Sequence, residues 1–276
     1  MTSLSGVSEV PAELQPIGLR EKICYGFGDV ASCLVYGALT SYMLFFFTDV
    51  ALLPAAAAGT LILVSRCMDG VSDVAMGLAI DRTNTKWGKC RPWLLWMALP
   101  WGVSVVMLFT APDFSLNGKI VYAWITYNVM TTIVYTGINM PYGALASMIT
   151  LNQQERGVLS VFRASFGCIS VFFVSTFTTT FVALFGGGPA GWQKTFLMFA
   201  VASVILFLLC FTGTRERVHT PKREVDIKLS EGLGALFKNK YWMIMTCINI
   251  GAASMATLYG LNAYYASYIL QDMGYN

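Results

Sequence analysis

The segment "LILVSRCMDGVSDVAMGLAIDR", residues 61–82, is long and apolar enough for a transmembrane helix, yet its interior contains three charged side chains. At about 100° per residue, Arg66, Asp69 and Asp73 fall on one stripe of such a helix. Each charge costs about 2.5 to 3.5 kcal/mol near the centre of a bilayer, whereas an apolar residue returns only about 0.3 to 0.6 kcal/mol. The stripe is therefore expected to face protein or water, and we predict that the function lies there.

The composition of the whole chain is that of a polytopic membrane protein. Of its 276 residues, 56% are hydrophobic and 12% are charged, whereas soluble domains carry about 25% charged residues. The mean hydropathy is +0.60, and apolar runs of about 20 residues recur along the chain. The net charge of +3 comes from unevenly distributed basic residues. We expect a lipid bilayer as the surroundings and no nucleic-acid partner.

We predict an all-α fold with seven spans, separated by loops rich in proline and glycine. The predicted spans are 26–48, 55–80, 92–111, 120–149, 158–185, 194–214 and 241–270. The polar segment 1–25 has no apolar core ahead of a cleavage site, so we expect a retained tail and not a signal peptide. A long polar connection, 215–240, separates the sixth and seventh spans.

The distribution of lysine and arginine predicts the orientation in the membrane. Of the 18 basic residues, 14 fall on one predicted side, Lys119 and Lys194 fall on the other, and Arg66 and Arg163 lie within spans. The positive-inside rule places the richer side, with the N-terminus, in the cytoplasm and Asn276 outside. The 14 residues are Arg20, Lys22, Arg82, Lys86, Lys89, Arg91, Arg156, Arg215, Arg217, Lys222, Arg223, Lys228, Lys238 and Lys240.

The parts needed by an enzyme or a nucleotide-driven pump are missing from the sequence. The chain has no HxxxH motif, no nucleophile elbow and no Walker loop. Its single histidine, His219, lies in the polar connection, where a solvated role is expected. The seven cysteines are scattered without a CxxC pair, which indicates packing residues and neither disulfides nor a soft-metal site. We therefore expect no enzymatic activity and no cofactor.

Two carboxylates at positions i and i+4 within a membrane predict a cation or proton site. They repel one another when both are ionised, so one holds a proton or the pair shares a small cation, and Arg66 can neutralise one of them. The alternative for Asp69 and Asp73 is an ion-pair network that only holds helices together. Arg163 is suited to the hydroxyl or carboxylate groups of a substrate, or it closes the charge balance with the aspartates.

The sequence after the charged stripe carries a recognisable motif. "GLAIDRTNTKWGKCRPW", residues 77–93, begins with G-x-x-x-D-R and resembles the loop between the second and third helices of the major facilitator superfamily. The motif residues, to which we assign a gating role, are Gly77, Asp81, Arg82, Lys86, Lys89 and Arg91.

Further motifs narrow the resemblance. With "KICYGFGDV" (22–30), "FFFTDV" (45–50) and "INMPYGAL" (138–145), the chain resembles the glycoside–pentoside–hexuronide:cation symporters, which include the melibiose and glucuronide carriers. The resemblance runs from about residue 22 to residue 275. It implies a secondary active transporter that moves a sugar or glycoside together with a cation across the bacterial inner membrane.

The resemblance also implies roles for residues at a cation site. Asp69 and Asp73 match the two carboxylates of the family's second helix, Arg66 matches the arginine beside them, and Thr136 matches a hydroxyl near the cation. Ser72 stands where the family's sodium site has an asparagine. Because a sodium ion needs several oxygen ligands and a proton needs one carboxylate, we expect H⁺ as the coupling ion, with Na⁺ as the alternative.

The substrate residues implied by the resemblance show several departures. Arg163 matches an arginine at the sugar site, whereas Asn139 and Cys33 stand where melibiose-type carriers have aspartates and Gly143 stands where they have a tryptophan. These changes put galactoside binding and sodium coupling in question. Asp29 is typical of the glucuronide and pentoside branch; a substrate or gating role and a simple helix-entry role remain equally open.

The family's transporters have two six-span bundles, and this chain matches little more than the first. The resemblance implies an N-terminal six-helix bundle at 26–214, an inter-bundle loop at 215–240 and the first helix of a second bundle at 241–276. We expect its partner to be the missing C-terminal half or another carrier subunit. The alternative from a different class is a non-transporting membrane sensor or a degenerate partner of a full-length carrier.

Overall fold

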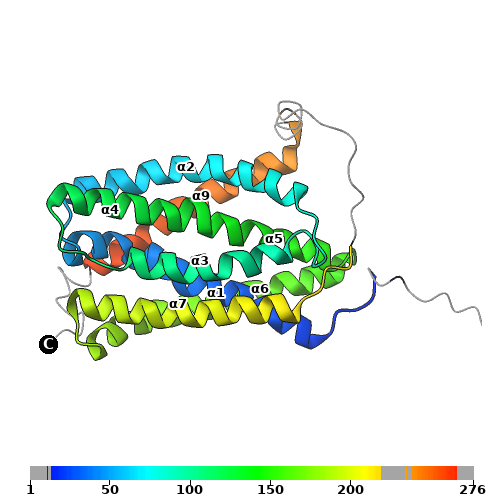
Figure 1. Cartoon of the computed structure of the whole chain (residues 1–276). Coiled ribbons are helices and arrows are strands. Elements are labelled where there is room, and N and C mark those ends of the chain that lie inside the picture. Colours follow the sequence, from blue (N-terminus) through cyan, green and yellow to red (C-terminus); the bar gives the residue numbers. More distant parts are fainter. Residues whose placement is uncertain (1–10, 12–13, 219–233, 235–237, 266–276) are drawn as a thin grey trace, which may run out of the picture.

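The computed structural model describes residues 11, 14–218, 234 and 238–265, and these form a bundle of long helices (Figure 1). Residues 1–10 and 12–13 of the predicted tail 1–25, residues 266–270 of the last predicted span, and His219, Lys222, Arg223 and Lys228 lie outside the described residues. Every named element among the described residues is helical, in agreement with the predicted all-α class. The elements are α1 (Leu19–Phe45), the π-helix η1 (Phe46–Val50), α2 (Ala55–Arg82), α3 (Arg91–Leu108), α4 (Leu116–Asn128), the π-helix η2 (Val129–Tyr135), α5 (Thr136–Ile149), α6 (Gln153–Leu184), α7 (Gly188–Gly213) and α9 (Lys240–Tyr264).

Four stretches among the described residues are long and apolar enough to cross a bilayer. They are Leu19–Val50, Arg91–Leu108, Gln153–Leu184 and Gly188–Gly213. The remaining predicted spans coincide with α2, with the continuous run of α4, η2 and α5, and with α9. The helices thus follow the predicted order, while the number of seven membrane crossings stays a prediction.

Most helices begin earlier than the sequence predicts, and the difference is largest for α1 and α7. α1 begins at Leu19 and not at residue 26, because its charged first turn is held by ion pairs: Lys22 Nζ lies 2.8 Å from Glu155 Oε2. α7 begins at Gly188, inside the predicted loop "GGGPAGWQK". Proline fits the first turn of a helix, where its missing N–H group is not needed, so Pro189 starts α7 instead of ending a loop.

The core of the bundle is built around α1. α1 packs mainly against α6 and α7, and α3 packs against α7 (Figure 1). At one end, rings from η1, from α7 and from Phe109 directly after α3 form an aromatic cluster, in which Phe46 lies 5.1 Å from Phe109 and 5.7 Å from Trp192, measured between centroids. Large buried side chains of this kind fix the distances between helices that carry functional groups.

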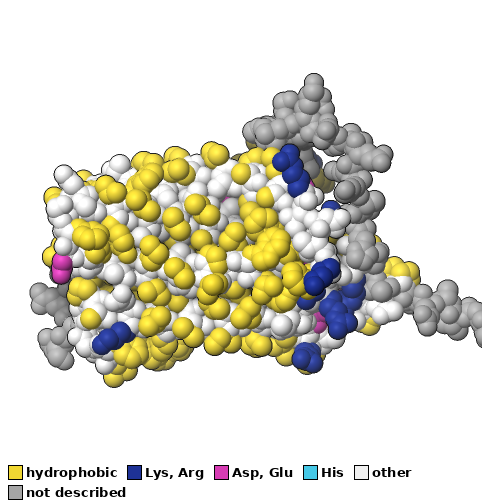
Figure 2. All heavy atoms as spheres, in the orientation of Figure 1, with side chains coloured by type: hydrophobic (Ala, Val, Ile, Leu, Met, Phe, Trp, Pro, Cys, Tyr) yellow, Lys and Arg dark blue, Asp and Glu magenta, His cyan; other side chains and the backbone are white. Residues whose placement is uncertain are grey.

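The outer surface separates into an apolar side wall and a basic end. Figure 2 shows hydrophobic side chains along the length of the bundle and lysine and arginine gathered mostly at one end. Exposed hydrophobic residues occur on α2, α3, α4, α6 and α7. Such a surface suits lipid contact along the sides and water at the ends.

A short segment after α7 closes the basic end of the bundle. The carboxylate of Glu216 accepts backbone N–H bonds from Lys89 (2.8 Å), Cys90 (2.8 Å) and Arg91 (2.7 Å) at the start of α3. These N–H groups have no partner within the helix, and the carboxylate also suits the positive end of the helix dipole. Gly88 has a φ of +110°, and a Cβ at this position would overlap the Glu216 carboxylate.

The same segment reaches α1 and α5. Glu21 accepts bonds from the backbone N–H of Arg215 (2.9 Å) and from both terminal nitrogens of Arg217 (3.0 and 2.7 Å). This bidentate bond raises the pKa of the Arg217 guanidinium. The N–H groups of Arg217 and Val218 donate to the carbonyl of Met148 at 2.9 and 3.0 Å. Residues 215–218, the closing segment, thereby join the ends of α1, α3 and α5.

Candidate functional site

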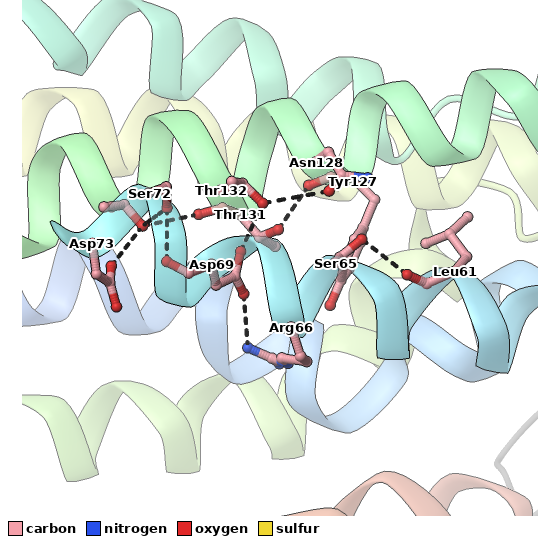
Figure 3. A network of polar contacts seen from close by, with 11 residues as sticks. Leu61, Ser65, Arg66, Asp69, Ser72, Asp73, Tyr127, Asn128, Thr131 and Thr132 are labelled. Atoms are coloured by element: carbon pink, nitrogen blue, oxygen red, sulfur yellow. Dashed lines mark hydrogen bonds and ion pairs between the residues drawn. The ribbon is translucent and has the colours of Figure 1, made fainter. Parts of the chain in front are cut away.

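The charged stripe of α2 lies against η2 and α5, where hydroxyl groups meet its carboxylates (Figure 3). Thr132 donates to Oδ1 of Asp69 at 2.7 Å, and Thr136 donates to Oδ1 of Asp73 at 3.1 Å. The Ser72 hydroxyl lies 3.4 Å from that of Thr136 and donates to the Asp69 carbonyl at 2.9 Å. Two carboxylates and three hydroxyls thus gather at one point of the helix pair.

The two aspartates differ in their charge partners. Arg66 Nη1 lies 3.6 Å from Oδ2 of Asp69. Among the described residues, Asp73 has no basic partner within ion-pair distance. The Arg66 side chain is 47% exposed and that of Asp69 is 20% exposed. The cluster therefore carries one negative charge that Arg66 leaves unbalanced, beside hydroxyl oxygens that can coordinate a small cation.

The donor set fits a proton or an alkali cation better than a transition metal. The described residues contain no group of three or more His, Cys, Asp or Glu side chains that could hold a metal ion. Carboxylate and hydroxyl oxygens are hard ligands, which suit ions such as Na⁺. A carboxylate alone suffices to carry a proton.

A second polar cluster joins α1 to α6. Arg163 Nε donates to Oδ1 of Asp29 at 3.0 Å, and the Cys33 thiol points to Oδ2 of Asp29 at 3.8 Å. The Arg163 guanidinium also lies 5.0 Å from the ring centroid of Tyr142, a cation–π contact. A Cβ built on Gly143 would lie 3.6 Å from Arg163 Nη1. The structure thus brings four predicted substrate residues together.

Asn139, the fifth predicted substrate residue, lies one turn after Thr136 on α5 and is half-buried. Among the described residues its side chain makes no hydrogen bond. It belongs to the same helix as Tyr142 and Gly143 and to the run that supplies the threonines, but no direct bond links it to either cluster. Its substrate role stays a prediction.

A stacked pair of tyrosines links the helices that carry the two polar clusters. Tyr36 of α1 stacks on Tyr135 of η2, with centroids 4.8 Å apart and ring planes 20° apart. Tyr36 follows Cys33 by one helical turn, and Tyr135 immediately precedes Thr136. The stacked pair connects the helix of the Asp29 cluster with the helix of the Asp69 cluster.

The predicted gating motif lies at the basic end of the bundle, and two of its members serve packing within the bundle. The backbone N–H groups of Lys89 and Arg91 bind Glu216, and the Arg91 side chain donates to the carbonyl of Phe211 at the end of α7 (Nη2 to O, 2.7 Å). The residues around this turn, including Lys86 and Arg215, line a cavity of about 470 Å³. Gly77, Asp81 and Arg82 lie on the last two turns of α2. Their gating role stays a prediction.

Four residues of these contacts were not predicted from the sequence: Thr132, Tyr36, Tyr135 and Glu216. Thr132 precedes Thr136 by four residues, as Asp69 precedes Asp73. That matched spacing was a signal that two helices lie side by side with their polar positions in register. No local pattern marks Glu216 or the tyrosine pair, because their partners are 125 to 127 and 99 positions away in the chain.

The chain is similar to known proteins along most of its length. The chain matches the model of the MFS/sugar transport protein family over residues 24–275. It is 37% identical to the inner membrane symporter YicJ of Escherichia coli over 259 residues, which cover 92% of this chain and 55% of YicJ. It is 36% identical to the isoprimeverose transporter of Lactiplantibacillus pentosus, covering 91% of this chain and 53% of that protein.

A third relative is the glucuronide carrier protein homolog of Escherichia coli, which is 31% identical over 94% of this chain and 57% of its own length. The chain spans about half the length of the curated relatives that it matches. The match includes both polar clusters. The chain therefore belongs to the MFS/sugar transport protein family and, within it, to the glycoside–pentoside–hexuronide:cation symporters.

Proposed function

We propose that this chain supplies the cation site and part of the sugar site of a sugar:cation symporter, and that its coupling ion is H⁺. The observation that carries the proposal is the unequal pairing of the two α2 aspartates. Asp69 has Arg66 beside it, whereas Asp73 is bound by the Thr136 hydroxyl and keeps its negative charge for a cation. Residues 26–214 would form the first bundle, and α9 would belong to the second.

The geometry offers a route for coupling between cation and sugar. The segment from Thr132 to Gly143 contacts the α2 carboxylates through Thr132 and Thr136, and it contacts Arg163 through the ring of Tyr142. It also stacks on α1 through Tyr135. A cation that draws in the two threonine hydroxyls would reposition this segment and thereby the groups that meet the sugar. Such coupling is reciprocal: each ligand tightens the binding of the other by the same factor.

The choice of H⁺ rests on the ligands at hand. A sodium ion needs a cage of several oxygens, and among the described residues the cluster offers it two carboxylates and the hydroxyls of Ser72, Thr132 and Thr136. A proton needs only one carboxylate, and it removes the repulsion between two acidic groups one helical turn apart. Access then alternates by rocking of one bundle against the other.

Sugar binding by the purified chain in lipid nanodiscs tests the proposal. We expect the dissociation constant for a nitrophenyl glycoside to fall as the pH is lowered and to be unaffected by replacing K⁺ with Na⁺. Asp73→Asn should remove the pH dependence, whereas Asp113→Asn, in the α3–α4 loop, should keep it. Binding that depends on Na⁺ at constant pH would overturn the choice of ion. Binding that depends on neither ion would overturn the coupling role.

A further inference from the structure

The guanidinium of Arg66 lies near a carboxylate of its own helix and near a hydroxyl group of α1. Its Nη1 is 3.6 Å from Oδ2 of Asp69 (Figure 3), which is longer than the distance of about 2.7 to 2.9 Å that is typical of a charge-assisted hydrogen bond. The hydroxyl of Tyr36 on α1 is also within hydrogen-bonding reach of this guanidinium, and Tyr127 of α4 lies nearby. Arg66 is therefore shared between α1 and α2 and is not bound tightly to Asp69.

Tyr36 contacts groups that support both α2 aspartates. Its hydroxyl meets Arg66, the ion-pair partner of the first aspartate. Its ring stacks on Tyr135, with centroids 4.8 Å apart. Tyr135 immediately precedes Thr136, whose hydroxyl binds Asp73. One side chain of α1 thus meets both halves of the Asp69 cluster.

The same face of α1 carries the Asp29 cluster. Asp29, Cys33 and Tyr36 are spaced by four and three residues, which places them on one stripe of a helix. The Cys33 thiol points to Asp29, and Asp29 binds Arg163 at 3.0 Å. Because α1 and α2 share few other contacts among the described residues, the pair of Tyr36 and Arg66 is the direct connection between the two polar clusters.

From these contacts we infer that Tyr36 is a positioning residue that couples the sugar site to the cation site by holding Arg66 back from the two carboxylates. This inference rests on the proposed function. Without the hydroxyl, the guanidinium is free to close on Asp69, and its positive charge then competes with the cation for the carboxylate pair. A sugar that displaces the Asp29 turn of α1 moves Tyr36 and thereby Arg66. The cation acts on the sugar through the same contact, since coupling is reciprocal.

Tyr36→Phe tests the inference, because it removes the hydroxyl and keeps the stacked ring. The dissociation constant of a nitrophenyl glycoside is measured with the purified chain in nanodiscs, over a pH series without Na⁺ and over a Na⁺ series at constant pH. Without cation, at high pH, we expect the constant to stay within about twofold of that of the unmodified chain. The cation concentration for half-maximal tightening should rise about tenfold, because a hydrogen bond to a charged group is lost. If the cation is a proton, the midpoint moves about one unit to lower pH.

The factor by which saturating cation tightens sugar binding should also fall in Tyr36→Phe. A residue that serves only packing would change the affinity for sugar equally with and without the cation. This factor therefore separates coupling from a general defect of the bundle.

Tyr42→Phe is the matched control, since it is the same substitution on the same helix. The Tyr42 hydroxyl donates to the Ser175 carbonyl of α6 at 2.7 Å, away from Arg66. Its loss removes a hydrogen bond between helices, so the midpoint of thermal unfolding should fall. The half-maximal cation concentration and the tightening factor should not change.

The outcomes distinguish this inference from the proposed function. If the unmodified chain binds sugar in a cation-dependent manner and Tyr36→Phe behaves identically, the inference fails and the proposed function stands. If Tyr36→Phe weakens sugar binding equally with and without cation, Tyr36 acts on the sugar directly and its coupling role is wrong. If Tyr42→Phe reduces the tightening factor as much as Tyr36→Phe does, the effect belongs to helix packing and the inference fails. If sugar binding by the unmodified chain depends on neither ion, the proposed function fails and the inference fails with it.

Discussion

The hydroxyl group of Thr132 lies 2.7 Å from Oδ1 of Asp69 and donates a hydrogen bond from η2 to α2. It does so opposite Arg66, which approaches the other carboxylate oxygen at 3.6 Å. Asp69 is thus held from two sides, and Asp73 is held by Thr136 alone among the described side chains. Under the proposed function, we expect Asp69, which has the stronger support, to set the geometry and Asp73 to respond to the cation.

Replacement of Thr132 by valine should weaken cation coupling. The substitution keeps the β-branched shape and removes a hydrogen bond to a charged group, which contributes about 1.5 to 3 kcal/mol. We expect the cation concentration for half-maximal stimulation of sugar binding to rise about tenfold. Thr131→Val is the control, because among the described residues the Thr131 hydroxyl donates only to the Tyr127 carbonyl of its own helical run (3.0 Å). Equal effects of the two substitutions would assign Thr132 to helix packing.

Accumulation of sugar should require residues that the chain does not contain. The chain spans 55% of YicJ, so in proteoliposomes we expect no uptake driven by an ion gradient from the chain alone. Co-reconstitution with the remaining part of YicJ should restore uptake. In the restored carrier Asp73→Asn should abolish accumulation and retain part of the downhill exchange, since exchange needs no net release of the ion. Strong uptake by the chain alone would show that it assembles a complete pathway with its own copies.

The charge bias makes a prediction about topology. With basic residues concentrated at one end (Figure 2), a reporter fused after Asn276 should be active only outside the cytoplasm, and one inserted near Pro221 only inside it. Paired alkaline phosphatase and green fluorescent protein fusions measure this. The opposite activities would rule out seven crossings with a cytoplasmic N-terminus.

Loss of the Glu216 carboxylate should destabilise the bundle. Glu216→Ala leaves three N–H groups at the start of α3 without their acceptor, and we expect a cost of about 2 kcal/mol, measured as a lower midpoint of thermal unfolding in detergent. Glu216→Gln, which keeps one acceptor oxygen, should cost less. The exposed carboxylate of Asp81 provides a control at the same end of the bundle, and Asp81→Ala should leave the midpoint nearly unchanged.

The sequence predicted the order of the helices because apolar periodicity and loop residues are local signals. The range 55–80 differs from α2 by only two residues at its end. The early start of α1 escaped prediction because a charged turn reads as a tail until its ion-pair partners, such as Glu155, are known. Likewise Pro189 is typical both of a loop and of the first turn of a helix, and only the packing of α7 decides between the two.

Site residues could be predicted where all of them lie on one helix. They could not be predicted where the site forms by contact between helices. Asp69 and Asp73 are conspicuous because two acids in an apolar run cost free energy wherever they lie. From the sequence, Asp29 could have either a site role or a helix-entry role. The sequence does not show that it pairs with Arg163, which lies 134 positions away in the chain. Physical proximity across that distance comes from the packing of α1 on α6, which no local pattern specifies.

The π-helix η2 limits which deletions the protein can tolerate. A π-helix behaves as a one-residue insertion in an α-helix, and such insertions are frequent at functional sites. η2 lies between α4 and α5 and contains Thr132, while Thr136 begins α5. Deleting one outward residue, such as the 58% exposed Ile133, would let the run close into a regular α-helix and would leave Thr132 and Thr136 three positions apart instead of four. Their hydroxyls would then no longer match the four-residue spacing of Asp69 and Asp73 on α2, so a carrier with this arrangement tolerates changes of residue type in η2 far better than a change in its number of residues.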